Sequence, residues 1–551
     1  MKGSGSIARA SRRLRSGAQA LVESLERAGT EVVFGYPGGN VVDVFDCLRT
    51  ARFRFVLGRH EQGCAHMADG YARATGRPGV AVVTSGPGAT NVITGLATAN
   101  VDGVPLVVVS GQVPLSQIGT DAFQEADMSG ICRAVTKHSF LVKSADEIPE
   151  TVAQAFYIAT HGKPGAVVID VPKNVQEEMT AAACPERISL RAYHPEHAAT
   201  PAQVSRLAKW VNEAKRPVLY AGGGVIAANA AKDVAALAHR AGLPVATTLM
   251  GIGSFDEGDP LALGMAGAYG TRAANAALAE ADLVLALGVR FNDRVTGDVA
   301  RFARRKRIVH VDCDPSSIDK NVPVDLGVVA DVKDLLTTVN SRIRPNARAA
   351  WRAKVSAWKA SSSQAPAPRR PGVIPPQAVV EAVRRATGGE ALLVTDVGQH
   401  QMLCARHFGP VRPRRFLSSG GMGTMGFAIP AAIGAAIARP DEKVVAIVGD
   451  GGAQMTSEEL IVAAEERLPV TFVVVNNRRL GLVRQLQEED FGKRYFATTI
   501  SSPDFVKLAE AHGVKGVRVS DPARLDAVLT RAVRAKRPTL VEVLVEEEAN
   551  V

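Results

Sequence analysis

The sequence predicts three α/β domains, each a doubly wound parallel sheet covered by helices on both faces. Short runs of valine, isoleucine and leucine alternate with helical patterns in every third of the chain, and this alternation is typical of βαβ units. The runs include GVAVVTSG and PLVVVSGQ, then PVLYAGGG and LVLALGVR, then VVAIVGDGG and VTFVVVNN. Continuous apolar runs are typical of strands buried on both faces. Their glycine, serine or asparagine endings fall where such sheets bind ligands.

Two interruptions of the apolar pattern set the domain boundaries. The first spans residues 181–201, and the second spans 345–376, where SSSQAPAPRRP has the composition of an exposed linker. We expect a basic disordered tail at 1–16, an N-terminal domain at 17–180 and a central domain at 200–340, followed by a linker at 341–376 and a C-terminal domain at 377–551. A chain of this length exceeds what one hydrophobic core supports.

The basic character of the chain is confined to two segments. The net charge is +10, but five basic residues lie within residues 1–15 and eight more in the acid-free stretch 342–370. The remainder is near neutral or slightly acidic, which argues against nucleic acid as a partner.

Other features of composition favour a cytoplasmic protein with no membrane partner. No apolar run approaches the roughly 18 residues that span a bilayer. Six scattered cysteines without metal-ligand spacing fit reduced thiols. The basic N-terminus lacks the apolar core of a secretory signal. Its composition fits a short transit peptide or, more simply, a plain extension.

The motif that carries chemistry lies at residues 444–477. A buried strand ends in GDGG at 449–452, and after a helix a second strand ends in Asn477. Glycines after a strand let the backbone approach a diphosphate, and the following helix start favours its negative charge. The Asp450 carboxylate and the Asn477 amide oxygen are ligands that Mg²⁺ accepts beside phosphate oxygens. A strand ending in GDG is alone an ordinary turn. The asparagine pair that follows 24 residues after GDG favours a diphosphate and metal site over an ordinary turn.

Thiamine diphosphate enzymes carry a similar motif, in which GDG, 24 residues and NN follow one another. In that family the third metal ligand is a backbone carbonyl, here that of Arg479. Further segments resemble catalytic subunits of the acetolactate synthase family, so the chain is identified as a member. They are FGYPGGN (34–40), RHEQGCAHMADGYAR (59–73), GTDAFQEAD (119–127), RFNDRVTG (290–297), VGQHQ (397–401) and SGGMGTMG (419–426). The resemblance implies three domains arranged as in pyruvate oxidase, with the pyrimidine bound by the first and the diphosphate by the last.

The resemblance also implies roles for single residues. Thiamine chemistry needs a carboxyl group that shares a proton with the aminopyrimidine, and Glu61 is the candidate. By position alone it would be an ordinary helix-start glutamate. Met425 would bend the cofactor between its rings, although methionine is more often core filler. Expected around the diphosphate and rings are Val397, Gly398, Gln399, His400, Gly423, Gly449, Gly451 and Gly452. Expected beside the substrate channel are Gly39, Phe123, Gln124 and Lys173.

The central third resembles the domain that holds FAD in biosynthetic acetolactate synthases, where the flavin takes no redox part. RFNDRVTG and the spacing of Asp312 and Asp331 carry this resemblance. The implied FAD-binding residues are Lys163, Gly222, Gly223, Thr247, Tyr269, Arg290, Asp312 and Asp331.

Four departures from the family pattern cluster near the acceptor and the flavin. Lys163 replaces an arginine, Asn40 replaces an alanine, and Ala268-Tyr269 replace Met-His. Leu486 replaces a tryptophan that, in the family, helps to select the second 2-oxo acid and contacts sulfonylurea herbicides. The acceptor preference therefore stays open.

The resemblance implies an enzyme that decarboxylates pyruvate on thiamine diphosphate with Mg²⁺. It then joins the two-carbon unit to a second 2-oxo acid, pyruvate or 2-oxobutanoate, in the first step of branched-chain amino acid synthesis. Alternatives are a related carboligase or acyltransferase with another acceptor, or a flavin-using oxidase of the pyruvate oxidase type. A homodimer or dimer of dimers is implied, in which Glu61 of one subunit completes the site at Asp450 of its neighbour. A separate regulatory small subunit stays open.

Overall fold

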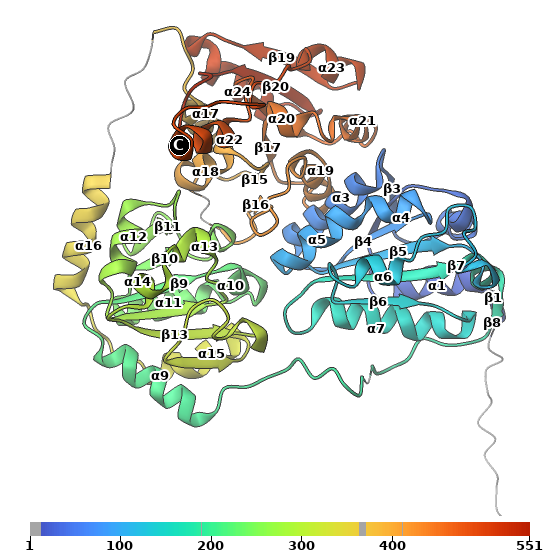
Figure 1. Ribbon diagram of the computed structural model, residues 1–551, viewed down its shortest axis with the longest axis horizontal. Helices are drawn as coiled ribbons and strands as arrows, with labels where there is room; N and C mark the ends of the chain where they lie inside the picture. Colours follow the sequence, from blue (N-terminus) through green and yellow to red (C-terminus); the bar gives the residue numbers. More distant parts are fainter. Residues whose placement is uncertain (1–12, 189, 363–370, 410–411) are drawn as a thin grey trace, which may run out of the picture.

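Three domains follow one another along the chain (Figure 1), of which the computed structural model describes residues 13–188, 190–362, 371–409 and 412–551. Each domain contains a six-stranded sheet, and every pair of neighbouring strands in the N-terminal sheet is parallel. The other two sheets are also parallel throughout. The predicted fold class is confirmed.

The N-terminal domain has the strand order β3-β2-β4-β5-β7-β6. Its strands are β2 (Val32–Gly35), β3 (Arg54–Leu57), β4 (Gly79–Val83), β5 (Leu106–Gln112), β6 (His138–Leu141) and β7 (Ala166–Pro172). Its helices are α1 (Gly17–Arg27), α2 (Val42–Leu48), α3 (Glu61–Thr75), α4 (Pro87–Asn91), α5 (Ile93–Asp102), α6 (Met128–Cys132), α7 (Ile148–Thr160) and α8 (Lys173–Glu177). Alternate residues of β5 enter two separate apolar cores, which explains why its sequence is apolar without interruption.

The central domain has the order β11-β10-β9-β12-β13-β14, the order of dinucleotide-binding sheets. Its strands are β9 (Pro217–Ala221), β10 (Val245–Thr247), β11 (Ala262–Met265), β12 (Leu283–Leu287), β13 (Arg307–Asp312) and β14 (Leu326–Val329). Its helices are α9 (Pro201–Glu213), α10 (Gly223–Ala227), α11 (Ala231–Ala241), α12 (Arg272–Glu280), α13 (Asp293–Thr296), α14 (Val299–Ala303), α15 (Val332–Val339) and α16 (Ala349–Ser362).

The C-terminal domain has the order β16-β15-β17-β18-β20-β19. Its strands are β15 (Leu392–Thr395), β16 (Phe416–Ser418), β17 (Val444–Gly449), β18 (Val470–Asn476), β19 (Lys515–Val519) and β20 (Thr539–Leu544). Its helices are α17 (Pro376–Thr387), α18 (Gln399–His407), α19 (Ala428–Ala438), α20 (Asp450–Ala453), α21 (Leu460–Glu465), α22 (Gly481–Asp490), α23 (Phe505–Ala511) and α24 (Leu525–Val533). Numbered within each domain, the first and third sheets share the order 2-1-3-4-6-5.

The strand orders fix where ligands can bind. Doubly wound sheets bind ligands beyond the carboxyl ends of the strands, where the strand order reverses. In the C-terminal sheet the reversal lies between β15 and β17, which end just before VGQHQ and at GDGG. In the central sheet it lies between β9 and β12. The sequence motifs therefore sit at the reversal points.

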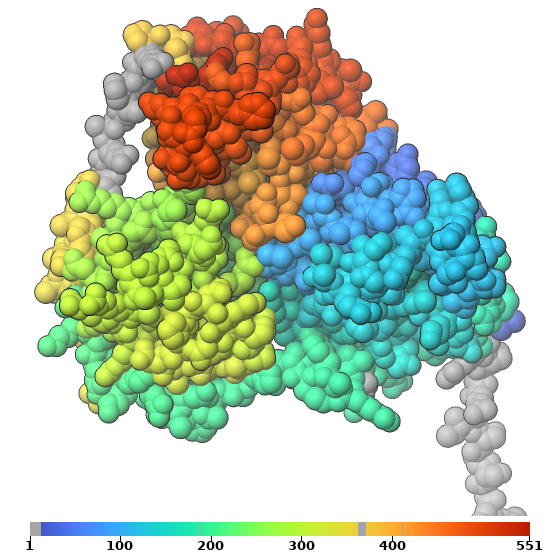
Figure 2. All heavy atoms as spheres, viewed as in Figure 1, coloured from blue at the N-terminus to red at the C-terminus, as the bar shows by residue number. Residues whose placement is uncertain are grey.

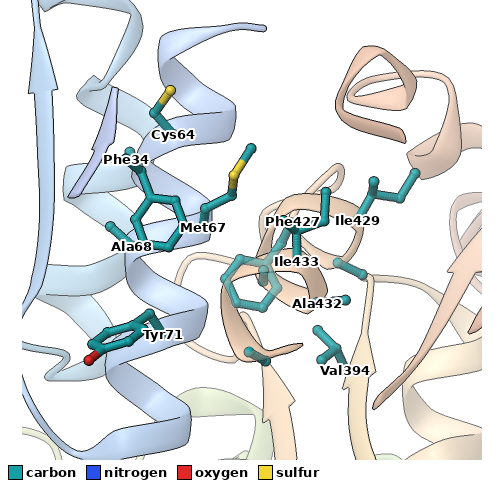
Figure 3. Packing of buried hydrophobic residues seen from close by; sticks show 14 of the residues in the cluster. Phe34, Cys64, Met67, Ala68, Tyr71, Val394, Phe427, Ile429, Ala432 and Ile433 are labelled. Atoms are coloured by element: carbon teal, nitrogen blue, oxygen red, sulfur yellow. The ribbon is translucent and has the colours of Figure 1, made fainter. Parts of the chain in front are cut away.

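The first and third domains share a core. Helices α3 and α19 lie side by side, and Phe34, Met67, Phe427 and Ile433 belong to one buried cluster (Figure 3). A Cβ atom at Gly434 would lie 1.8 Å from the Met67 carbonyl oxygen, so the two helix backbones approach as closely as they do only because this residue is glycine. The space-filling view shows the three domains in contact with one another (Figure 2).

Two expected boundaries are wrong. The tail was expected to reach residue 16, but Arg15 and Ser16 form β1 and pair with β8 (Met179–Thr180). The pairing is reinforced because the Arg15 guanidinium donates to the Ala182 carbonyl oxygen at 2.8 Å. Residues 1–12 of the expected tail lie outside the described residues.

The linker expected at 341–376 contains the helix α16, which packs on the central domain. Trp351 is buried in the core of that domain, and its Nε1 donates to the Pro217 carbonyl oxygen at 3.0 Å. The basic composition concealed an amphipathic helix, because Arg352 and Lys354 are exposed on its outer face. The remaining part of the expected linker, residues 363–370, lies outside the described residues. Within the described part of the chain, none of the helices combines the length and apolarity needed to cross a membrane.

Candidate active site

A cavity opens at the order reversal of the C-terminal sheet. Its lining includes nine of the residues expected from the sequence together with Asn477 and Arg479, and all lining residues come from the C-terminal domain. They are Pro376, Val397, Gly398, Gln399, His400, Met425, Gly449, Asp450, Gly451, Gly452, Val475, Asn477, Arg479, Leu480, Gly481, Leu482 and Val483. Gly423 lies outside this lining, in the loop that carries Met425.

Asp450 is the only acidic side chain in the lining. It is 1 % exposed, and burial raises its pKa to about 6. Ser502 Oγ donates to Asp450 Oδ2 at 3.1 Å, and the Asn477 Oδ1 accepts the Arg479 N–H at 3.1 Å. A buried carboxylate and an amide oxygen among glycines fit a magnesium ion whose other ligands are phosphate oxygens. The described residues contain no cluster of three His, Cys, Asp or Glu side chains suited to a metal.

His400 provides a second indication of an anionic ligand. Its side chain is buried and its Nε2 has no hydrogen-bond partner among the described residues. Burial lowers the pKa of His400 to about 4, so the ring is neutral at physiological pH. Gly398 has φ +150, a conformation that favours glycine, and it brings the chain past the imidazole. An unpartnered buried nitrogen costs stability and fits a phosphate oxygen as its missing partner.

Gln399 lines the same cavity, but its amide nitrogen is bound elsewhere. Gln399 Nε2 donates to the Ala549 carbonyl oxygen at 2.8 Å and to Gln485 Oε1 at 3.0 Å. This side chain therefore ties the C-terminal segment to α22, in addition to bordering the cavity.

The loop that carries Met425 joins β16 to α19. Its glycines Gly423 and Gly426 have φ +67 and +83, values that favour glycine. A residue that sequence reasoning missed holds its end: Asp396 accepts the Gly426 N–H at 3.1 Å and the Ala428 N–H at 3.0 Å. Asp396 is fully buried, and burial raises its pKa to about 6. Its position directly before VGQHQ was the available signal.

Glu61 belongs to a second group of residues, at the carboxyl edge of the N-terminal sheet. It begins α3, and Asn91 Nδ2 donates to Glu61 Oε2 at 3.0 Å. The start of α4 and the residues before it lie between this glutamate and Gln124, because a Cβ at Gly88 would lie 3.1 Å from Glu61 Oε1 and one at Gly86 would lie 2.9 Å from Gln124 Cα. None of these residues lines the Asp450 cavity. The Glu61 group and the Asp450 cavity therefore lie on separate domains.

The other expected channel residues lie around the same edge. Gly39 begins the short 3₁₀ turn after β2, and Lys173 begins α8 directly after β7. Gln124 has φ +61, and the neighbouring Phe123 side chain is 87 % exposed. Asn40 Nδ2 donates to Ser85 Oγ at 2.7 Å, so this departure from the family pattern is accommodated by a new hydrogen bond.

Sequence reasoning also missed Glu459, which follows no motif. It reaches from the C-terminal domain to the start of α3 and accepts the His60 N–H at 3.0 Å. Glu459 is buried, and burial raises its pKa to about 8. The neutral carboxyl group therefore fixes the backbone immediately before Glu61.

The central domain brings several expected FAD residues to one edge. Gly222 and Gly223 follow β9, and Thr247 ends β10 with its buried Oγ1 unpartnered within the described ranges. Asp312 ends β13; burial raises its pKa to about 6, while Lys163 and Arg290 lower it. The unpartnered hydroxyl at the end of β10 and the charged groups around the end of β13 lie along the same edge of the sheet, an arrangement that fits an extended dinucleotide.

Three other expected FAD residues have additional partners. Asp331 caps α15, where its Oδ1 accepts the Lys333 N–H at 2.8 Å. Tyr269 lies close enough to Glu489 for that carboxylate to raise its pKa, although burial is the larger cause. Arg290 donates to the Val101 carbonyl oxygen of the N-terminal domain at 2.8 Å.

Comparison with known proteins agrees with this geometry. Three profiles match in order: the N-terminal TPP binding domain of thiamine pyrophosphate enzymes over residues 15–131, the central domain over 204–339 and the C-terminal TPP binding domain over 396–543. The fold and the site thus define a thiamine pyrophosphate enzyme. Similar relatives include the acetolactate synthase large subunit of Haemophilus influenzae, 44% identical over 97% of this chain and 95% of its own length.

Two further relatives match this chain to a similar extent. The large subunit of acetolactate synthase isozyme 3 of Escherichia coli is 43% identical over 97% of this chain and 96% of its own length. The mitochondrial acetolactate synthase catalytic subunit of Saccharomyces cerevisiae is 43% identical over 97% of this chain and 81% of its own length. The chain belongs to the acetolactate synthase large-subunit family.

Proposed function

We propose that this chain is the catalytic subunit of an acetolactate synthase, which decarboxylates pyruvate and joins the two-carbon unit to a second 2-oxo acid. The observation that supports this proposal most directly is the Asp450 cavity, which lies where the strand order of the C-terminal sheet reverses. The cavity contains a buried carboxylate and the unpartnered His400 nitrogen. When bound, thiamine diphosphate supplies the electron sink for decarboxylation. Asp450, Asn477 and the Arg479 carbonyl would hold Mg²⁺, His400 would contact the diphosphate, and Met425 would keep the cofactor bent.

The direct test is product analysis. Purified protein with thiamine diphosphate and Mg²⁺ is incubated with pyruvate alone and with pyruvate plus 2-oxobutanoate. Acetolactate is expected in the first reaction. Acetyl phosphate or hydrogen peroxide in place of acetolactate would instead indicate the oxidase alternative.

A homodimer completes the proposed site. Glu61 and the Asp450 cavity lie on separate domains, and we propose that they are two half-sites which a second subunit brings together. Exposed apolar side chains support such an interface at both half-sites: Tyr36, Ile118 and Phe123 on the N-terminal domain, and Met422, Met455, Val483 and Phe496 on the C-terminal domain. Apolar surface of this kind is typical of contacts between subunits. Because several relatives are named large subunits, a separate small subunit is part of the proposal.

FAD is proposed as a structural cofactor of the central domain. Purified protein is expected to be yellow, and pyruvate under anaerobic conditions should not bleach it, because joining two 2-oxo acids needs no electron acceptor. Thr247→Val removes the unpartnered hydroxyl without changing side-chain volume, and should weaken FAD retention while thiamine diphosphate affinity stays unchanged. Flavin absorbance measures FAD retention, and titration calorimetry measures thiamine diphosphate affinity. A colourless protein with full activity and no added FAD would mean that Lys163 and Tyr269 mark a lost site.

We propose weak selection between acceptors. Leu486 is half-buried on α22, and Tyr269 of the central domain lies near Glu489 on the same helix. Replacing an indole by Leu486 removes aromatic surface there. One methylene recognised in an apolar pocket is worth about 1–3 kcal/mol, and a loosely packed pocket cannot realise that contact energy. We expect 2-acetolactate as the main product, weak preference for 2-oxobutanoate over pyruvate, and tolerance of sulfonylureas.

The Leu486→Trp variant tests this expectation. It should raise the preference for 2-oxobutanoate and restore sulfonylurea sensitivity together, because one aromatic surface serves both. Competition assays with both acceptors measure the preference. A strong preference for 2-oxobutanoate in the unmodified protein would contradict the argument and would mean that neighbouring side chains refill the pocket.

A further inference from the structure

The loop 419–426, which carries Met425, is bound at its start by a helix of another domain. Asp102, the last residue of α5, accepts the Gly421 N–H at 2.7 Å with Oδ1 and the Gly420 N–H at 3.1 Å with Oδ2. One turn earlier on α5, Thr98 Oγ1 lies 2.7 Å from Thr424 Oγ1, and both residues are buried. The N-terminal domain therefore contacts the loop at three residues before Met425, through two backbone N–H groups and one side-chain hydroxyl.

Asp102 is a buried charge with a fixed partner. Its side chain is 0% exposed, and its Oδ2 pairs with Arg73 at 3.0 Å. Arg73 also pairs with Asp69, and the Arg73 Nη1 donates to the Ser418 carbonyl oxygen at 2.8 Å. A buried carboxylate is retained only when hydrogen bonds compensate its desolvation. Here two of the compensating donors are N–H groups of the loop.

The central domain reaches the same place. Arg290 donates to the Val101 carbonyl oxygen at 2.8 Å, and its second terminal nitrogen lies 3.8 Å from Asp102 Oδ1. A Cβ at Gly420 would lie 2.4 Å from the Met250 sulfur, so the loop backbone also packs against the central domain. In the space-filling view an orange part of the C-terminal domain lies between the green and blue domains (Figure 2).

The loop needs such external contacts because its own sequence does not fix it. Four of its eight residues are glycine, which lose more backbone entropy on ordering than other residues. Asp396 holds the end of the loop at Gly426 and Ala428. Asp102 and Thr98 hold the beginning, so Met425 lies between two anchored segments.

We infer that Asp102 and Thr98 are positioning residues that set the location of Met425 against the cofactor. The inference rests on the proposed role of Met425 in bending thiamine diphosphate. Bending brings the cofactor amine to the C2 proton, and reacting groups displaced by about 1 Å can lose 10²-fold in rate. The helix α5 of the N-terminal domain thereby acts on the reaction without touching substrate.

The test is the rate of C2 proton exchange, measured by NMR after acid quench with thiamine diphosphate and Mg²⁺ saturating. Asp102→Asn keeps the shape but removes the charge and one acceptor, and should slow exchange about tenfold to a hundredfold. Thr98→Val removes a hydroxyl and leaves every charge unchanged. It should also slow C2 proton exchange, but by less than Asp102→Asn does. Thermal unfolding confirms that each variant is folded during the measurement.

Asp69→Asn is the matched control. Asp69 is equally buried and pairs with the same Arg73, but in the described part of the chain it has no hydrogen bond to residues 419–426. This variant should lose thermal stability and keep the wild-type exchange rate. Equal slowing in Asp69→Asn and Asp102→Asn, or normal exchange in both Asp102→Asn and Thr98→Val, would overturn the inference.

Met425→Ala separates this inference from the proposal beneath it. If Met425→Ala slows exchange and the Asp102 and Thr98 variants do not, only the inference on positioning is wrong. If Met425→Ala exchanges normally, the role of Met425 itself is wrong, and the inference is overturned with it.

Discussion

The Asp450→Ala variant is expected to lose thiamine diphosphate binding and all activity. Asp450 supplies the only carboxylate in the lining of the cavity, and without it a divalent cation would be left with neutral ligands beside a diphosphate. Titration calorimetry with thiamine diphosphate and Mg²⁺ measures the loss. Dialysis of the wild type against EDTA should release the cofactor, and Mg²⁺ should restore it.

Ser502→Ala is the matched control for this prediction. It removes the hydroxyl that donates to Asp450 Oδ2 at 3.1 Å and leaves the carboxylate in place. Cofactor affinity should fall by about tenfold to a hundredfold and not be abolished, because one hydrogen bond to a charged group is worth about 1.5–3 kcal/mol. Full activity of Asp450→Ala would refute the metal site.

The Glu61→Gln variant is expected to bind thiamine diphosphate but to turn over roughly 10²-fold more slowly or worse, the loss typical of an acid–base group. Glutamine keeps the shape of the side chain and cannot share the pyrimidine proton. Calorimetry checks that cofactor affinity is retained, and C2 proton exchange by NMR measures the chemical defect. An unchanged exchange rate would remove Glu61 from its role.

Mixing the two inactive variants tests the shared site. When Asp450→Ala and Glu61→Gln chains reassort at random into dimers, half of the dimers are mixed, and each mixed dimer contains one intact site. About a quarter of wild-type activity should therefore return. No recovery, with mixed dimers demonstrated by differential tags, would mean that each chain builds its site alone.

Much of the fold was readable from local patterns. Uninterrupted Val and Ile runs such as 444–448 predicted buried parallel strands because both faces of each sheet are covered. The polar interruptions gave the domain boundaries approximately. The error at residues 349–362 arose because α16 has a weak apolar stripe among basic and small residues, and only its packing through Trp351 reveals it as part of the central domain.

The sequence by itself determined the chemistry of the diphosphate site. The spacing from GDG to NN fixes two strand ends that are neighbours in a parallel sheet, since β17 pairs directly with β18. Residues at consecutive strand ends therefore lie near one another, which is why the sequence predicts that Asp450 and Asn477 border the same cavity, as they do.

Only the tertiary structure decided how the domains act on one another. Four side chains illustrate this: Asp102, Asp396, Glu459 and Ser502. They lie far in sequence from the groups they contact or belong to no motif. Most of their partners are backbone N–H groups. A backbone donor has no sequence signature, so such contacts cannot be read from residue types. The separation of Glu61 from the Asp450 cavity is likewise a property of domain packing, because it depends on how α3 lies against α19 and not on either motif alone.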